Sequence, residues 1–193
     1  MNAAVLAPRG TPTTKKAVKL PEHIVEVISD SGEGAQRCGQ AFASIAARSG
    51  NGIWTVEIIP AEIQPPARSV AGASGIRIRV GSNHVNNGGD ETDLVVAFNE
   101  QVLLGRVRAG ELKQGATILL ENMWGEHRDP VIARTYPEAV KALKDAGFRV
   151  IPRPLEKECR ALMSDARRGK NMFVLGVLAS IYSLDLQLAR DQI

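Results

Sequence analysis

The stretch IVEVISDSGEGAQRCG, residues 24–39, gives the strongest indication of the fold. Residues 24–28 are apolar except for one glutamate, which is typical of a strand buried in a parallel sheet. Gly32 and Gly34 follow, and residues 35–49 then place apolar side chains at helical spacing. The stretch therefore predicts a strand, a tight turn and a helix, and the free backbone N–H groups at the start of such a helix can bind an anion.

A second loop of unusual composition follows the next predicted strand. Residues 60–75 read PAEIQPPARSVAGASG and contain three prolines, two glycines and a single arginine, Arg68. Both this loop and the glycine turn follow a strand. Because the carboxyl ends of parallel strands lie at one edge of a sheet and form its ligand crevice, we expect the two loops to meet there. The functional surface is predicted at that edge.

The order of the remaining elements predicts the fold class. Apolar runs that alternate with helical patterns indicate an α/β fold of three layers, Rossmann-like, with a mostly parallel sheet and helices on both faces. The run Ile-Arg-Ile-Arg-Val at residues 76–80 alternates with period two and favours an antiparallel or edge strand. A very apolar last helix is expected in the core or in an interface. Further strands are predicted at residues 54–59, 94–98, 117–121 and 149–151, and further helices at residues 100–108, 137–146, 155–167 and 171–189.

The charge of the chain is unevenly distributed. The net charge of +3 arises within residues 1–22, and the rest carries equal numbers of basic and acidic residues. Together with an aromatic content of 4%, this argues against a nucleic-acid-binding domain. Residues 1–22 are predicted to be a flexible basic arm, or alternatively a docking arm for a partner subunit, and residues 23–193 a single domain.

The cysteines and the apolar segments bear on the compartment. Cys38 and Cys159 are far apart and lack metal-site spacing, so a reducing compartment is favoured over a disulfide framework. Residues 172–184 are apolar but shorter than the roughly 20 residues of a membrane span. We therefore expect a cytoplasmic protein without a membrane partner. Cys38 opens the first helix, where the helix dipole lowers a thiol pKa, although a small buried residue is the more common role there.

The glycine turn resembles a dinucleotide-binding turn only in part. After Gly32 and Gly34, the third glycine position of G-x-G-x-x-G holds Arg37, and Glu33 places a negative charge inside the turn. A structural turn and a ligand-binding turn therefore fit the pattern about equally well. An independent nucleotide-binding protein that uses NAD stays open as an alternative, and so does a pure interaction module.

Arg68 is the strongest single candidate for a binding residue. A guanidinium in a proline-stiffened loop can hold a carboxylate or phosphate through two hydrogen bonds, whereas a surface arginine paired with a neighbouring acid is the alternative. If Arg68 binds a ligand or a subunit, Arg68→Ala should weaken that binding with little effect on folding. The spacing of the histidines and carboxylates indicates neither a catalytic set nor a metal site.

Four stretches resemble the gamma-type domain of the 2-oxoacid:ferredoxin oxidoreductases, in the version found at the N-terminus of the alpha subunit of 2-oxoglutarate enzymes. They are the turn SGEGAQ with Cys38-Gly39, the arginine loop EIIPAEIQPPARSVAGASG with the strand after it, the strand at residues 93–99, and the helix NMFVLGVLASIYSL at residues 171–184. Together they cover residues 23–190.

The resemblance implies a share in the oxidative decarboxylation of a 2-oxoacid, with 2-oxoglutarate favoured, to an acyl-CoA with reduction of ferredoxin. It implies coenzyme A as a ligand of this domain. Thiamine diphosphate, magnesium and iron–sulfur clusters are expected in partner domains or subunits, so the chain alone should be inactive. The resemblance places Gly32, Glu33, Gly34 and Gln36 in the cofactor-binding turn, and Arg68 and Ser69 toward the partner or ligand.

Overall fold

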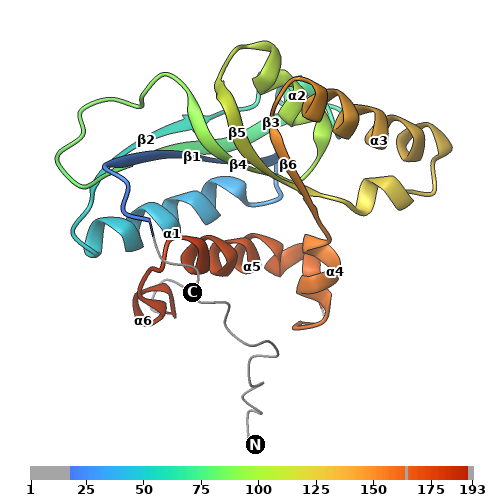
Figure 1. The fold of residues 1–193 in the computed structure, drawn as a ribbon. Coiled ribbons are helices and arrows are strands. Elements are labelled where there is room, and N and C mark those ends of the chain that lie inside the picture. The colour runs from blue at the N-terminus through green and yellow to red at the C-terminus, as the bar shows by residue number, and fades with distance from the viewer. Residues whose placement is uncertain (1–17, 164, 191–193) are drawn as a thin grey trace, which may run out of the picture.

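A six-stranded sheet forms the middle layer of the computed structural model, which describes residues 18–163 and 165–190 (Figure 1). The strand order is β2-β3-β1-β4-β5-β6. Strands β1, β4, β5 and β6 are parallel, and β3 runs antiparallel to both β1 and β2. The strands are β1 (Glu22–Asp30), β2 (Gly52–Ile58), β3 (Ala73–Gly81), β4 (Thr92–Ala97), β5 (Leu112–Glu121) and β6 (Arg149–Arg153).

The mostly parallel α/β fold predicted from the sequence is confirmed. The Ile-Arg-Ile-Arg-Val run lies in β3 and is antiparallel, but the outer edge of the sheet next to it is β2. The alternation in β3 reflects two different buried environments. Ile76 and Ile78 face one apolar core, while Arg77 on the opposite face is also buried, because it pairs with acids there.

Helices cover both faces of the sheet (Figure 1). Helices α1 and α5 lie on one face with the short α4 and α6, and α2 and α3 lie on the other. Val174, Leu175 and Leu178 of α5 are buried in the core under the first face, so this helix is a core helix. The helices are α1 (Ala35–Arg48), α2 (Glu100–Arg108), α3 (Pro130–Asp145), α4 (Leu155–Arg160), α5 (Ala166–Ile181) and α6 (Leu186–Arg190), with single 3-10 turns η1 (Val70–Gly72) and η2 (Met123–Glu126).

Several helix boundaries differ from the predicted ones. The helix predicted at residues 155–167 is the shorter α4, which ends at Arg160, and α5 starts at Ala166 rather than at residue 171. Helix α3 starts at Pro130 because the Asp129 side chain accepts a hydrogen bond from Val131 N at 2.8 Å, which caps the helix there. Pro137, predicted as the first residue, lies inside the helix. The apolar last helix was predicted to continue to residue 189. It ends at Ile181, because Ser183 has a positive φ of 51° that breaks the helix before α6.

A charged cluster is enclosed in the core on the α2 face of the sheet. The Glu26 carboxylate of β1 is fully buried and accepts hydrogen bonds from Arg77 Nε at 2.7 Å and from Thr92 Oγ1 at 2.8 Å. Arg106 of α2 reaches the same carboxylate at 2.8 Å, and Glu111 pairs with Arg77 at 2.5 Å. Buried charges need such partners, since leaving one unpaired is costly.

The predicted domain start and the environment of the two cysteines can be compared with the structure. Strand β1 begins at Glu22, close to the predicted start of the domain, while residues 1–17 of the predicted arm lie outside the described residues. Cys38 and Cys159 are both free and buried. Burial raises the pKa of the Cys38 thiol to about 12, which outweighs the helix dipole and makes this thiol unreactive. Among the helices that the structure describes, none is long and apolar enough to cross a membrane.

Candidate functional site

The glycine turn and the arginine loop meet at the carboxyl end of β1, as predicted. The two carboxylate oxygens of Asp30 accept hydrogen bonds from the backbone N–H of Arg68 at 2.9 and 2.8 Å. Ser31 N donates to Gly72 O at 3.0 Å, which joins the two loops a second time. We call the region formed by the turn, this loop and the starts of α2 and α5 the crevice. Strands β1, β4 and β5 end here, where open α/β sheets bind ligands.

The Arg68 side chain is turned toward the protein. Its guanidinium forms an ion pair with the fully buried carboxylate of Glu100 and lies over the Trp124 ring, 4.6 Å from the ring centroid. Trp124 is itself held by a hydrogen bond from its Nε1 to Phe98 O at 2.7 Å. Arg68 has a positive φ of 53°, a conformation that the Asp30 carboxylate supports by accepting its N–H. A role of Arg68 in ligand binding stays a prediction, but its charge already has a partner.

The charge of Glu33 inside the turn is also paired. Its Oε2 accepts a hydrogen bond from Asp30 N at 3.1 Å, and its Oε1 receives one from Lys170 Nζ at 2.9 Å. Lys170 comes from α5, is only 4% exposed and lies over the Phe98 ring at 4.7 Å. The negative charge of Glu33 in the turn is therefore paired with a lysine that lies near the other end of the sequence. This partner cannot be found from local sequence, because Glu33 and Lys170 are 137 positions apart in the chain.

The other predicted site residues take mainly structural positions in the crevice. Gln36 donates from Nε2 to Ile58 O at 3.2 Å, which ties α1 to the end of β2. The Ser69 hydroxyl accepts from Gly72 N at 3.1 Å and donates to Pro66 O at 2.7 Å, so it shapes the arginine loop. No side chain in the described residues caps the start of α1, where Gly34 is the N-cap residue. Uncapped N–H groups at a helix start are the kind of group that binds anions, so an anion site at this turn stays a prediction.

Several residues of the crevice were not predicted as site residues. They are Glu100 at the start of α2, Trp124 in η2, and Lys170 and Asn171 in α5. Glu121 ends β5 and is fully buried, and its carboxylate accepts hydrogen bonds from Asn122 N, Met123 N and Glu156 N at 2.8, 3.0 and 2.8 Å. Glu121 is the last residue of the apolar strand β5 and Glu100 is the first residue of α2, and an acid at the end of a buried strand is the signal that could have found Glu121.

Burial raises the pKa of two acids at this edge of the sheet, Asp30 and Glu121. Loss of hydration raises the pKa of Asp30 and of Glu121 above the usual values for these acids, and the hydrogen bonds to each carboxylate oppose that rise. Among the described residues, four buried polar atoms have no hydrogen-bond partner: Arg68 Nε, Asn99 Nδ2, Glu100 Oε2 and Tyr136 Oη. The crevice therefore retains hydrogen-bonding capacity that the protein itself does not use.

The two glycines of the turn provide a matched pair of substitutions. Gly32 and Gly34 have positive φ of 87° and 83°, so alanine is strained at both. A Cβ at Gly34 would lie 2.5 Å from Asn171 Nδ2, whereas at Gly32 it would meet open space. We expect Gly32→Ala to cost about 1 kcal/mol of unfolding free energy from backbone strain, and Gly34→Ala more because the Asn171 side chain must also move aside. Urea titration measures both, and equal losses would show that the Asn171 contact does not matter.

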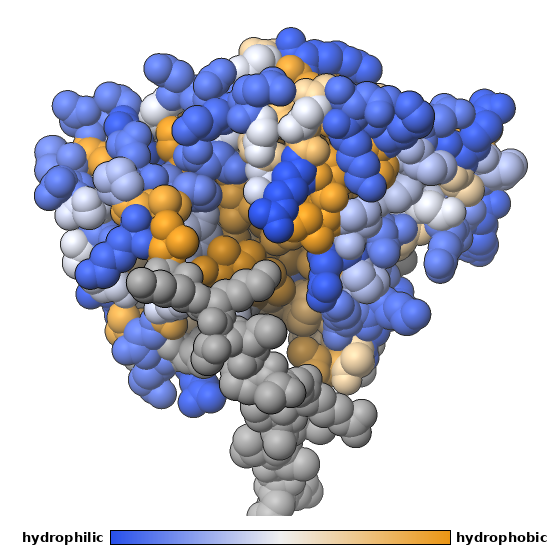
Figure 2. Space-filling view, in the orientation of Figure 1, coloured by the Kyte–Doolittle hydropathy of each residue, from blue (hydrophilic) through white to orange (hydrophobic). Residues whose placement is uncertain are grey.

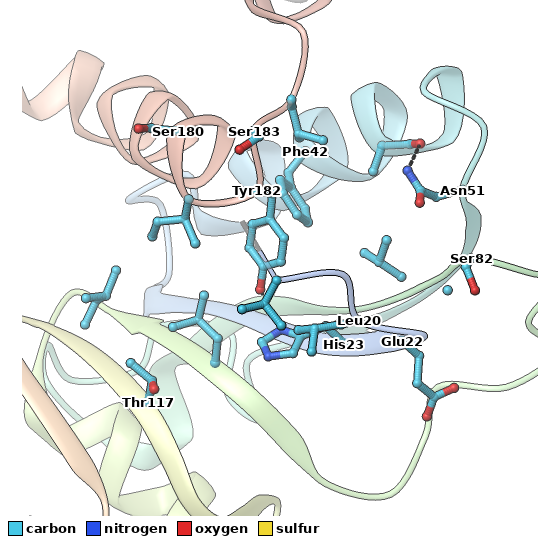
Figure 3. A pocket seen from close by; sticks show the side chains of 18 of the residues that line it. Leu20, Glu22, His23, Phe42, Asn51, Ser82, Thr117, Ser180, Tyr182 and Ser183 are labelled. Atoms are coloured by element: carbon cyan, nitrogen blue, oxygen red, sulfur yellow. Dashed lines mark hydrogen bonds between the residues drawn. The ribbon is translucent and has the colours of Figure 1, made fainter. Parts of the chain in front are cut away.

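A cavity lies at the opposite end of the sheet. It has a volume of 750 Å³ and lies between the sheet and the ends of α1 and α5. Figure 3 shows His23 and Tyr182 pointing toward each other inside it, with Phe42 beside them. His23 Nδ1 and Tyr182 Oη are 2.7 Å apart. The cavity and the crevice therefore lie in different places. The crevice remains the candidate site, because the predicted site residues and the buried charged side chains lie there.

The His23–Tyr182 contact predicts a pH dependence of stability. Burial lowers the pKa of His23 below its ordinary value, the nearby Asp93 raises it and Lys113 lowers it. A group with a lowered folded-state pKa stabilises the fold above its unfolded pKa of about 6.5 and loses this contribution as the pH falls. We therefore expect the unfolding free energy to decrease between pH 7 and 5, and less so in His23→Gln. Urea titrations at several pH values measure this, with His84→Gln as control. An unchanged slope in His23→Gln would contradict it.

The sequence of the chain identifies its family. Residues 26–193 match the family described as pyruvate ferredoxin/flavodoxin oxidoreductase, and the chain belongs to it. Within this family it is a 2-oxoacid:ferredoxin oxidoreductase gamma-type domain, as its motifs predicted. Over 176 residues it is 29% identical to the 2-oxoglutarate oxidoreductase subunit KorA of Mycobacterium tuberculosis. The alignment covers 88% of this chain but 27% of that relative, so the chain spans about a quarter of its length.

Solved structures share the fold. The 2-oxoglutarate:ferredoxin oxidoreductase of Magnetococcus marinus, with 2-oxoglutarate, coenzyme A and succinyl-CoA bound, aligns with a TM-score of 0.66 and 23% identity over 90% of this chain and 27% of that one. The gamma subunit of a keto/oxoacid ferredoxin oxidoreductase from Geobacter sulfurreducens aligns with a TM-score of 0.61 and 13% identity. That alignment covers 89% of this chain and 82% of the Geobacter subunit, which is a chain of similar extent.

Proposed function

We propose that this chain is a subunit or N-terminal domain of a 2-oxoacid:ferredoxin oxidoreductase that acts on 2-oxoglutarate. The whole assembly would oxidatively decarboxylate the 2-oxoacid to an acyl-CoA and pass the electrons to ferredoxin. The observation that carries the proposal is the similarity to KorA, which extends over 88% of this chain. The preference for 2-oxoglutarate over other 2-oxoacids rests on the same relative.

The chain itself is proposed to support catalysis rather than perform it. Among the described residues there is no cluster of histidine, cysteine or acidic side chains that could hold a metal ion. Both cysteines are single and buried, so neither can take part in a four-cysteine cluster site. We propose that thiamine diphosphate, magnesium and iron–sulfur clusters are held by partner domains or subunits, and that the assembly is cytoplasmic.

The crevice is the proposed contact for coenzyme A. Its support is the uncapped start of α1 behind Gly34, where backbone N–H groups can receive a phosphate. The two basic side chains of the crevice are less available, because Arg68 pairs with Glu100 and Lys170 with Glu33. We therefore assign phosphate recognition to the backbone of the turn at Gly32–Gln36 and assign Arg68 and Ser69 to the shape of the adjoining loop.

Affinity purification tests the proposed assembly. The tagged chain is isolated under anaerobic conditions from its native host, and the proteins that accompany it are identified by mass spectrometry. The proposal predicts that a thiamine-binding subunit and an iron–sulfur subunit accompany the chain in constant proportion. A chain that elutes alone as a monomer, with no thiamine-binding protein in the same host fraction, would contradict it.

Calorimetric titration distinguishes coenzyme A binding from the alternative that the chain is an independent NAD-binding protein. Coenzyme A and NADH share an adenosine diphosphate portion, so each controls for the general affinity of the turn for nucleotides. We expect saturable binding of coenzyme A and no binding of NADH. The opposite ranking would favour an independent NAD-binding protein, and binding of neither ligand would leave an interaction module without a nucleotide.

A further inference from the structure

The outermost strand β2 leaves one edge of the sheet unpaired. Strands β2 and β6 are the two ends of the sheet (Figure 1), and among the described residues β3 is the only strand that pairs with β2. Because an edge strand bonds on one side only, half of its backbone N–H and C=O groups point away from its neighbour. Residues 54–57 of β2 are all exposed. The strand therefore offers a row of backbone hydrogen-bonding groups to another strand.

The two edges of the sheet differ in how they resist pairing with another strand. Strand β6 carries Arg149 and Arg153 as well as Pro152, which has no N–H to donate. An antiparallel copy of β6 centred on Ile151 would also place Arg149 opposite Arg153 of the second copy, where like charges repel. Strand β2, with the sequence GIWTVEI, contains no proline, lysine or arginine. The β2 edge therefore lacks the residues that commonly prevent such pairing.

The side chains of β2 are complementary to those of a second copy. Trp54 and Val56 share one face of the strand, and each is 44% exposed. When two β2 strands pair antiparallel with Thr55 opposite Thr55, each Trp54 lies opposite Val56 of the other copy. Pairs of an aromatic with a β-branched residue, and pairs of threonines, stabilise neighbouring strands. Glu57, the one charged residue of β2, then lies opposite Ile53, so no like charges oppose each other.

The charge of the domain does not oppose such a contact either. Residues 23–193 have equal numbers of basic and acidic residues, so two copies of the domain do not repel each other through net charge. Apolar side chains also gather around the cavity at the amino ends of the parallel strands (Figure 2), but the His23–Tyr182 contact of 2.7 Å crosses that space. The open edge of β2 is therefore the better docking surface.

We propose that two copies of this chain associate through β2, antiparallel and about a twofold axis that passes between the two Thr55 residues. The two six-stranded sheets then form one sheet of twelve strands, and open sheets of up to about 15 strands occur in large α/β enzymes. Main-chain hydrogen bonds supply the affinity, and the Trp54–Val56 pairs set the register. One strand pair is a small interface, so we expect a dissociation constant on the order of micromolar. The proposal does not depend on the proposed oxidoreductase function.

Disulfide cross-linking in the full chain tests the register. In the proposed pair the two Thr55 Cα atoms are about 4.5–5.5 Å apart, a distance that a disulfide spans, so Thr55→Cys should be cross-linked under mild oxidation. Glu57→Cys is the matched control, because position 57 is exposed on the same strand but its two copies lie roughly 14 Å apart along the strands. It should remain a monomer on a non-reducing gel. The natural Cys38 and Cys159 are buried and do not interfere.

Sedimentation velocity at about 5 to 200 μM measures the association itself. We expect a reversible equilibrium of monomer and dimer that Trp54→Lys weakens about tenfold or more. Val131→Lys should leave it unchanged, since Val131 is 57% exposed but lies on α3. Val56→Glu should weaken it as Trp54→Lys does. A mixture of the Trp54→Lys and Val56→Glu chains should form a heterodimer, because lysine then opposes glutamate at one position and Trp54 opposes Val56 at the other.

Far-UV circular dichroism confirms that each variant is folded. The proposal is overturned if the chain is monomeric over this concentration range, or if Trp54→Lys associates as the unmodified chain does. It is also overturned if the chain dimerises but Thr55→Cys and Glu57→Cys are cross-linked equally, since the dimer would then use a different surface or register.

Discussion

Glu26→Ala is expected to lower the free energy of unfolding by about 3–5 kcal/mol, the range found when one partner of a buried ion pair is removed. Glu26 is fully buried and receives hydrogen bonds from Arg77, Thr92 and Arg106. Without its carboxylate, Arg77 stays in the core with only Glu111 as a charged partner. For a chain of this size the loss corresponds to a fall in melting temperature of roughly 10 °C. Urea and thermal unfolding measure it.

Lys141→Ala provides the contrast for this prediction. Lys141 and Asp145 form an ion pair on α3 at 2.5 Å, but their side chains are 77% and 62% exposed. Exposed pairs contribute about 0.2–1 kcal/mol, so this variant should unfold almost like the unmodified chain. If both variants lose the same small amount, the buried cluster contributes no more than a surface pair, and the account of Glu26 is wrong.

Arg68→Ala is expected to destabilise the chain by about 3 kcal/mol, because it leaves the Glu100 carboxylate buried and unpaired. This differs from the expectation drawn from the sequence, in which the arginine faced a ligand and contributed little to folding. The contact of its guanidinium with the Trp124 ring would also be lost, so the tryptophan emission should change in the folded variant. Thermal unfolding and fluorescence measure the two effects.

A double variant separates the structural role of Arg68 from a role in binding. Arg68→Met together with Glu100→Gln removes both charges, and should regain most of the stability that Arg68→Ala loses. If this stable variant binds coenzyme A as the unmodified chain does, Arg68 acts only on the loop. If binding is lost while stability is regained, the guanidinium contacts the ligand. A double variant as unstable as Arg68→Ala would show that the ion pair is not the source of the loss.

The sequence predicts the fold well where the spacing of apolar residues and the residue composition indicate the same element. The strand–turn–helix at the start and the Ile-Arg-Ile-Arg-Val strand were both predicted, because buried runs and alternation follow directly from which faces a strand buries. The boundaries of the last helices were wrong, since the break at Ser183 depends on a backbone conformation that its residue type does not favour. The position of Pro137 inside α3 could not be predicted either, because proline more commonly marks a helix start.

The sequence predicted which two loops form the candidate site, but it did not predict how the charged side chains pair there. Two strand ends at one edge of a sheet bring the glycine turn and the arginine loop together, and Asp30 makes that contact. The partners of the charged residues are set by tertiary packing. Lys170 reaches Glu33 from α5, and Glu100 reaches Arg68 from the start of α2, so neither pair follows from local spacing.

The most direct test of the central claim is reduction of a viologen dye by the complex isolated through this chain. The account predicts that dye reduction under anaerobic conditions requires both 2-oxoglutarate and coenzyme A, that succinyl-CoA accumulates with it, and that pyruvate supports it far less. The chain purified alone should show no reduction. A complex containing this chain that reduces the dye without coenzyme A, or that shows no activity with any 2-oxoacid, would contradict the account.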